Sequence, residues 1–317
     1  MSEPGPALPL LNDRSRWIDL DGPVHYLDFG GPSDGPVVVC VHGLGGSAVN
    51  WVAIAPLLTD RCRVLAPDLA GHGLTRSAGR ATTVTANRAL LHRFIESAAS
   101  GPVILMGNSM GGMISLLQAG TAPGLVAGLI LVDPALPIVP ARPDPAVTAL
   151  FAMYATPLLG PMLMDRRRRM SPEAAVLATL SLCCVDVSRI PADVVAQHVE
   201  VARRRVGVPG VEQDFLAAAR SVMATAGYVR GWPYRRMIRS IQSPVLLLHG
   251  ARDRLVPLAA ARVAARHNPS WSLIVLPDVG HVPQLEAPQD TANAIRDWLE
   301  SAGQPAVQAA TRGPQVV

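Results

Sequence analysis

The sequence predicts an α/β protein with a mostly parallel, doubly wound sheet and an inserted all-helical cap. Short, continuous, β-branched apolar runs alternate with helical patterns over the first half of the chain. Such runs are typical of parallel strands that are buried on both faces. The alternation stops between residues 136 and 239, where only helical patterns occur, and then resumes. This interruption predicts a helical insertion into a single sheet domain.

The elements of the first half follow in chain order. His25–Phe29 alternates between polar and apolar side chains, which fits an antiparallel edge strand. Continuous apolar runs then predict buried strands at Pro36–Val41, Cys62–Ala66, Pro102–Met106 and Val126–Val132. Helical patterns stand between them at Ser47–Leu58, Val84–Ala99 and Met110–Ala119.

The second half completes the organisation. Strands are expected at Pro244–Leu248 and Leu273–Leu276, and helices at Leu258–Arg266 and Pro288–Ser301. Sheets of this kind bind ligands at the carboxyl ends of their strands, so we expect the cap to cover that edge. The predicted division is a first core part at 1–135, the cap at 136–239, a second core part at 240–302 and a flexible tail at 303–317.

Composition excludes several classes of protein. Of the 317 residues, 49% are hydrophobic and only 16% are charged, a balance that favours a large buried core over disorder. All 28 basic residues are arginine, which excludes chemistry that needs a lysine, such as a Schiff base. Aromatic residues make up 4%, so few rings are available to stack on bases, and we expect no nucleic-acid partner.

The cysteines and the runs of charge indicate where the protein is located and what its surface contacts. Cys40 and Cys62 lie inside apolar runs and Cys183-Cys184 are neighbours, a pattern that indicates free thiols. The first residues also lack the pattern of a signal peptide, so the expected location is cytoplasmic. The arginine runs 166–169 and 203–205 are expected on solvated helix faces. Because an apolar stripe precedes the first run, transient contact with an anionic membrane surface is a further hypothesis.

A five-residue motif marks the candidate nucleophile. Gly107-Asn108-Ser109-Met110-Gly111 fits G-x-S-x-G and lies between a predicted buried strand and a predicted helix. In that context the serine occupies a tight, strained turn that exposes its hydroxyl above the sheet, and small neighbours let other backbone pass close by. The alternative role for Ser109 is a simple helix N-cap, which the flanking glycines disfavour.

A catalytic serine requires a base, and the base requires an acid that orients it. His281 follows the last predicted strand, and Asp253 follows the strand before it. Both loops therefore open at the sheet edge where Ser109 is expected, in the order serine, acid, histidine. Asp133, at the end of Val126–Val132, is an alternative acid, and the triad order together with the G-x-x-D pattern at 250–253 favours Asp253.

Further motifs complete a family pattern. They are HGLGG at 42–46, PDLAGHG at 67–73, GNSMGG at 107–112, GARDRLVP at 250–257 and DVGHVPQLEAP at 278–288. With them the chain resembles the α/β hydrolases over almost its full length. The resemblance implies the α/β-hydrolase fold and acyl transfer through a Ser–His–Asp triad. It also implies an oxyanion hole formed by the backbone N–H groups of Leu44 and Met110, with no metal and no cofactor.

One motif favours a different chemistry. Residues 43–48 also match G-x-G-x-x-A, the dinucleotide-binding fingerprint, with Asp68 at the end of the next strand. That fingerprint normally follows the first strand of its sheet, whereas His25–Phe29 already precedes it here. It also leaves the serine motif and the two late loops without a role, so we expect no dinucleotide.

The predicted function is hydrolysis of a carboxylic ester or lactone of a small-to-medium apolar substrate. An alternative is cleavage of a carbon–carbon bond, because GNSMGG is similar to the elbow of meta-cleavage-product hydrolases. Arg189 would then bind the substrate carboxylate, although Val282 stands where those enzymes have tryptophan. A third hypothesis is a ligand-binding or signalling protein on a hydrolase scaffold.

The cap is rich in apolar side chains, which either pack in its core or line an apolar substrate tunnel. They are Met153, Tyr154, Leu158, Leu159, Met162, Leu163 and Met164.

Overall fold

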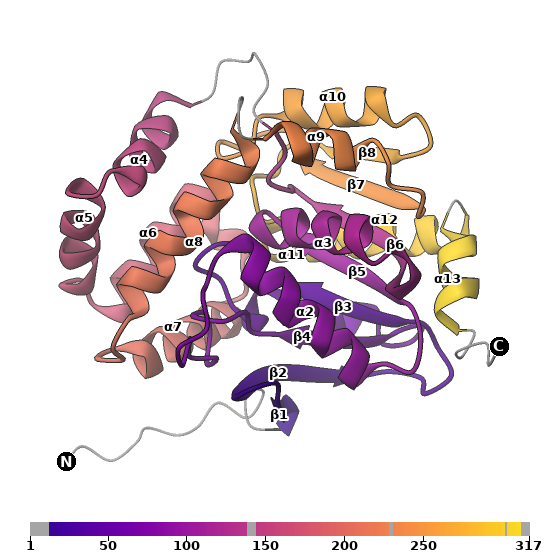
Figure 1. Cartoon of the computed structure of the whole chain (residues 1–317), viewed down its shortest axis with the longest axis horizontal. Coiled ribbons are helices and arrows are strands. Elements are labelled where there is room, and N and C mark those ends of the chain that lie inside the picture. The colour runs from indigo at the N-terminus through magenta and orange to yellow at the C-terminus, as the bar shows by residue number, and fades with distance from the viewer. Residues whose placement is uncertain (1–12, 138–143, 228–230, 302, 312–317) are drawn as a thin grey trace.

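The computed structural model describes residues 13–137, 144–227, 231–301 and 303–311, and its centre is one eight-stranded sheet (Figure 1). The strand order is β1-β2-β4-β3-β5-β6-β7-β8. Strand β2 pairs antiparallel with β1 and β4, and the remaining neighbours pair in parallel. The strands are β1 Ser15–Asp19, β2 Pro23–Gly30, β3 Val37–Val41, β4 Arg63–Pro67, β5 Val103–Asn108, β6 Val126–Val132, β7 Val245–Gly250 and β8 Ser272–Leu276.

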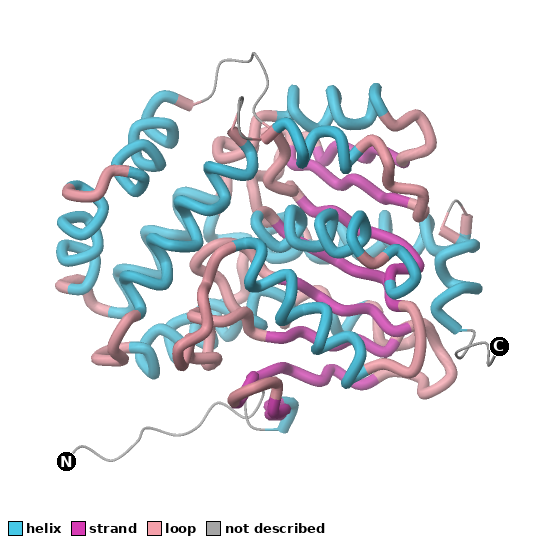
Figure 2. Tube along the Cα trace, in the orientation of Figure 1, coloured by secondary structure: helices cyan, strands magenta, loops and turns pink. Residues whose placement is uncertain are grey.

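The central strands are apolar throughout because both faces of the sheet are covered. Along β5, Val103 and Leu105 belong to one hydrophobic core, and Ile104 and Met106 belong to the other. Helices α2 Val84–Ala98, α3 Met110–Thr121 and α10 Leu258–His267 cover the first core. The second lies under η1 Ala48–Trp51, α12 Pro288–Glu300 and α13 Gln304–Thr311. Figure 2 shows the sheet between these helical layers.

The described residues between β6 and β7 form helices and no strand. Figure 1 shows most of them gathered at one end of the sheet, as a cap beside the carboxyl ends of the parallel strands. They are α4 Pro145–Ala155, α5 Leu159–Arg168, α6 Pro172–Cys183, η4 Val187–Arg189, α7 Ala192–Arg205, α8 Val211–Ala226 and α9 Trp232–Ile238. Helix α9 differs, because its Tyr234 and Ile238 join the first core and Tyr234 Oη donates to the Ala135 carbonyl at 2.9 Å.

Three elements differ from the sequence-based expectation. Strand β2 is not the edge strand, since β1 pairs beyond it, and most β1 side chains are too exposed to leave an apolar pattern. The predicted helix Ser47–Leu58 forms two short 3₁₀ helices, η1 and η2 Ala55–Leu57, because Pro56 has no N–H to continue a longer helix. Within the predicted flexible tail, α13 packs on the sheet through buried Ala306.

The buried carboxylate of Asp68 ties three segments of the core together. Its Oδ2 lies 2.7 Å from His25 Nδ1 and accepts the Leu74 N–H at 2.7 Å, while Oδ1 accepts the Ala48 N–H at 2.6 Å. Burial alone would raise the pKa of Asp68. The hydrogen bond and charge of His25, with the nearby His42, outweigh burial and lower this pKa.

Replacing Asp68 with asparagine is therefore expected to lower the free energy of unfolding at neutral pH by about 2–4 kcal/mol. The folded-state pKa lies below the unfolded value of about 3.9, so the stabilisation is complete above the unfolded pKa. It is lost as the pH falls through the folded-state pKa, and the wild type and the variant should converge there. Urea unfolding at neutral and acidic pH measures this, with the exposed Asp34→Asn as control. Equal stability of Asp68→Asn and wild type at neutral pH would contradict the assignment.

Candidate active site

Ser109 stands at a strained turn between β5 and α3. Its backbone has φ 54° and ψ −117°, a region that residues other than glycine rarely occupy. The turn is possible because its neighbour Gly111 has no side chain, since a Cβ there would collide with the carbonyl oxygens of Val41 and His42. The local sequence thus forces Ser109 to the carboxyl end of the sheet, where its side chain remains partly exposed.

The predicted base and acid form a buried pair. His281 Nδ1 lies 2.8 Å from Asp253 Oδ2, and both side chains are almost fully buried. Asp253 Oδ1 accepts the N–H groups of Leu255 at 2.7 Å and Val256 at 3.1 Å. With Nδ1 donating to a carboxylate, His281 presents Nε2 as its basic nitrogen. This orientation is the one that a general base requires.

A second carboxyl group, Asp133, lies behind this pair. It directly follows β6 with φ 44°, and its Oδ1 accepts the Gly250 N–H at 2.9 Å. Burial, reinforced by the charge of Asp253, raises the pKa of Asp133 well above its ordinary value. Burial also opposes ionisation of Asp253, but the charge and hydrogen bond of His281 lower its pKa. The two pKa values are therefore shifted in opposite directions, and the carboxyl with the lowered pKa, Asp253, is the one that contacts His281.

The link between Ser109 and His281 runs through the backbone. Asn108, next to Ser109, donates from Nδ2 to the carbonyl oxygens of His281 and Val132, both at 3.0 Å. Within the described ranges, the Ser109 hydroxyl makes no hydrogen bond, to His281 or to any other group. The structure thus joins the predicted acid to the predicted base and leaves the serine hydroxyl unbonded. Catalytic hydrogen bonds often close only when substrate is bound.

Two unoccupied N–H donors stand beside the serine. Among the described residues, neither the Leu44 N–H nor the Met110 N–H has an acceptor. Met110 opens α3, where helix N–H groups are free to bind an anion. The loop that carries Leu44 passes over the serine, since a Cβ on Gly43 would lie 3.2 Å from Ser109 Cβ. That loop, which also holds the dinucleotide-like fingerprint, leads from β3 into a 3₁₀ helix instead of the long helix that a dinucleotide site uses.

Apolar cap residues pack against this loop. Buried Tyr154, Met164, Leu216 and Ala219 form a cluster to which the partly buried Leu44, Leu163 and Phe215 also belong. The Phe215 ring lies against Gly45, where a Cβ would come within 3.0 Å of it. Other cap residues predicted for a core or tunnel are exposed instead, namely Leu158, Leu159 and Met162.

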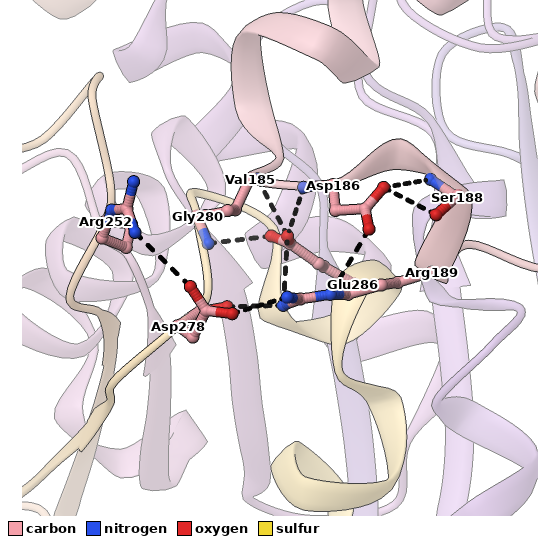
Figure 3. A network of polar contacts seen from close by, with 8 residues as sticks. All are labelled: Val185, Asp186, Ser188, Arg189, Arg252, Asp278, Gly280 and Glu286. Carbon is pink, nitrogen blue, oxygen red and sulfur yellow. Dashed lines mark hydrogen bonds and ion pairs between the residues drawn. The ribbon is translucent and has the colours of Figure 1, made fainter.

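Glu286 was not predicted from the sequence, and it holds the loop of His281 to the cap (Figure 3). Its fully buried carboxylate accepts the N–H groups of Val185 at 2.8 Å and Asp186 at 2.9 Å on Oε1, and that of Gly280 at 2.8 Å on Oε2. The His281 N–H donates to the Cys183 carbonyl at 2.7 Å in the same region. In the sequence, the only sign of this role was that Glu286 lies five residues after His281. That spacing cannot reveal hydrogen-bond partners that are 100 residues away in the chain.

Arg189 has a different role from the one predicted. Its guanidinium donates to the carbonyl of Asp278 at 2.6 Å and to Asp278 Oδ2 at 2.5 Å, and lies 3.8 Å from Glu286 (Figure 3). Instead of presenting a charge for a substrate carboxylate, Arg189 pairs the cap with the loop that precedes His281.

Comparison with known proteins supports the fold and the family resemblance. Residues 38–294 match the model of the alpha/beta hydrolase family. A pimeloyl-acyl-carrier-protein methyl ester esterase of Aromatoleum aromaticum is 30% identical over 83% of this chain and 97% of its own length. A 2-hydroxy-6-oxo-6-(2'-aminophenyl)hexa-2,4-dienoic acid hydrolase of Metapseudomonas resinovorans is 27% identical over 90% of both chains.

Two further similarities concern length and fold. A dihydrolipoyllysine-residue acetyltransferase component of the acetoin cleaving system of Pseudomonas putida is 29% identical over 90% of this chain, which spans 66% of that relative's length. A thermophilic esterase from Thermogutta terrifontis has the same fold, with a TM-score of 0.65 and 24% identity over 91% of this chain and 98% of its own. On its fold, its motifs and these similarities, the chain belongs to the alpha/beta hydrolase family.

Proposed function

We propose that this hydrolase cleaves a carboxylic ester or lactone of a small-to-medium apolar substrate, with Ser109 as nucleophile. The observation that carries the proposal is the buried contact of His281 Nδ1 with the ionised Asp253, at the sheet edge where Ser109 stands. This pair supplies a base of the correct tautomer, and the Leu44 and Met110 N–H groups supply donors for an oxyanion.

The proposed cycle uses only groups of this chain, substrate and water. His281 Nε2 takes the Ser109 proton while the oxygen attacks the substrate carbonyl, and the resulting oxyanion accepts hydrogen bonds from Leu44 and Met110. His281 then returns the proton to the leaving alcohol oxygen, which breaks the ester bond and forms the acyl-enzyme. Water, activated by the same histidine, releases the acid and restores Ser109.

Two features support a neutral, apolar substrate over a dienoate. The cluster around Tyr154 and Phe215 places apolar side chains next to the Leu44 loop. Arg189, the candidate for binding a carboxylate, is engaged with Asp278. Carbon–carbon bond cleavage remains the second candidate, because a hydrolase of that class is 27% identical to this chain.

We also propose a cytoplasmic location, which the four free cysteines support.

The proposal predicts strong turnover of p-nitrophenyl esters or lactones and weak turnover of a ring-fission dienoate. It also predicts covalent labelling of the wild type by a fluorophosphonate. Ser109→Ala removes the nucleophile, so labelling should vanish and kcat should fall by about 10⁴-fold or more. Chain-length and lactone panels on both proteins measure this. A fully active or fully labelled Ser109→Ala protein would overturn the assignment, and a preference for the dienoate would select the second candidate.

Replacement by asparagine is predicted to affect activity differently at Asp253 and at Asp133. Asp253→Asn should lower kcat by about 10⁴-fold, because an amide cannot hold the His281 tautomer or stabilise the imidazolium. Asp133→Asn should keep activity within about tenfold of wild type, since an asparagine oxygen can still accept the Gly250 N–H and the amide places no charge beside Asp253. Steady-state kinetics of both variants tests this. The reverse pattern would make Asp133 the catalytic acid.

Glu286 is proposed as a positioning residue for His281. In Glu286→Gln an NH₂ group replaces one of the two acceptor oxygens and faces a backbone N–H, so two donors meet. The repulsion between them should displace the Gly280-His281 turn. We expect kcat and the rate of fluorophosphonate labelling to fall by about 10–100-fold with KM nearly unchanged, the loss that a small misplacement of a catalytic group causes. Glu286→Asp should recover part of the loss, and Asp290→Asn on the exposed side of α12 is the matched control. Unchanged labelling of a folded Glu286→Gln protein would refute the role.

A further inference from the structure

The outer edge of the cap carries an uncharged stretch followed by a dense positive charge. Residues 145–164, which form α4, the turn after it and the first part of α5, contain no charged side chain. The next five residues are Asp165 and four arginines, with a net charge of +3. Leu158 and Met162 are 80% and 67% exposed, unusual values for such large apolar side chains.

These side chains form a stripe on the outer face of the helix. Tyr154 and Met164 turn inward and pack with Leu216 and Ala219 of α8. Leu158, Met162 and Arg166 follow one another at intervals of four residues, so they share one helix face. Figure 1 shows α4 and α5 at the outer margin of the cap, on the side away from the sheet. The stripe is therefore apolar at one end, cationic at the other, and open to solvent.

In the second arginine run, residues 203–205, each guanidinium has a partner within the protein. Arg203 pairs with Glu173, Arg204 pairs with Glu200, and Arg205 donates to the carbonyls of Gly71 and Gly73.

The run on α5 keeps its excess charge. Arg168 and Arg169 share the single carboxylate of Asp165, and their side chains are still 69% and 77% exposed. Arg166 is exposed and makes no ion pair with any described residue. Only Arg167 is directed inward, to Thr179 Oγ1 at 2.7 Å.

We propose that the outer stripe of α5 and its two ends docks on the surface of a membrane containing anionic lipid. The stripe consists of Leu158, Leu159, Met162, Arg166, Arg168 and Arg169. Large apolar side chains beside arginines match the interface of such a bilayer, with the apolar groups among the acyl chains and the cations at the phosphates. An acidic protein would pair with the arginines but would leave Leu158 and Met162 without a matching environment.

The geometry of α4 and α5 favours a position on the membrane surface over one across the membrane. No single helix in the described part of the chain has the length and apolar character to cross a bilayer. Helices α4 and α5 together reach that length, but they meet at 104° and bury their inner faces on α8. A bent pair held in this way can offer its outer face to a surface without leaving the cap. Docking would bring the cap to the place where apolar acyl substrates dissolve, and it does not depend on the chemistry of Ser109.

The test is sedimentation of the full chain with vesicles of phosphatidylglycerol or of phosphatidylcholine. The wild type should bind the anionic vesicles, lose binding at high salt, and bind phosphatidylcholine weakly. Arg166→Gln with Arg169→Gln should weaken binding by about fivefold per arginine. The matched control removes two exposed cations of α10, Arg262→Gln with Arg266→Gln, and should bind like wild type.

The apolar half of the stripe is tested separately. Leu158→Ser with Met162→Ser should reduce vesicle binding, and Val206→Ser, at a similarly exposed site just after α7, should not. All variants should hydrolyse a soluble short-chain ester like wild type, and Ser109→Ala should still bind vesicles, which separates this proposal from the proposed reaction. Absence of vesicle binding, equal loss in the controls, or a dimer that dissociates when Leu158 and Met162 are replaced would overturn it.

Discussion

The position of the proposed catalytic groups depends on one buried negative charge, that of Asp253. A carboxylate removed from water is costly unless donors surround it, and here they are the N–H groups of Leu255 and Val256 and the ring of His281. These contacts fix the loop after β7 and the orientation of the imidazole together. The same charge acts on the neighbouring Asp133, whose pKa is raised by burial and by repulsion from Asp253, because two adjacent buried charges of one sign repel strongly.

The contacts of the cap differ between its two ends. Near η4, Glu286 and Arg189 join it to the loop of His281 through buried hydrogen bonds and ion pairs. At the other end, α4 and α5 pack on α8 through apolar side chains, and the ion pair of Asp144 with Arg254, which joins the start of α4 to the core, is partly exposed to solvent. Separating apolar side chains leaves no buried charge unpaired, whereas separating the first end would strand the carboxylate of Glu286. A cap that moves to admit substrate is therefore expected to hinge near η4 and open at α4 and α5.

The sequence was most informative where chemistry dictates short local patterns. Ser109, the strands around it, and the loops with Asp253 and His281 were predictable because a strained turn requires glycines and buried parallel strands require apolar runs. Strand β1 was not, since its side chains are mostly exposed, and the 3₁₀ helices at 48–57 follow from the position of a single proline. Glu286 and Arg189 were missed or misassigned because their partners are distant in the chain, and only the fold brings these groups together.

Three independent features bear on the chemical nature of the substrate. The engagement of Arg189 by Asp278 leaves that cation paired within the protein, so it favours a substrate without a carboxylate. The cluster of Tyr154, Phe215 and Leu44 favours an apolar group beside the proposed oxyanion donors. The exposed stripe of α5 favours an environment in which such molecules are concentrated. A polar, freely diffusing substrate would require none of the three. The substrate class that we propose, a neutral ester reached from the membrane surface that we also propose, would account for all of them through one property, its preference for apolar surroundings.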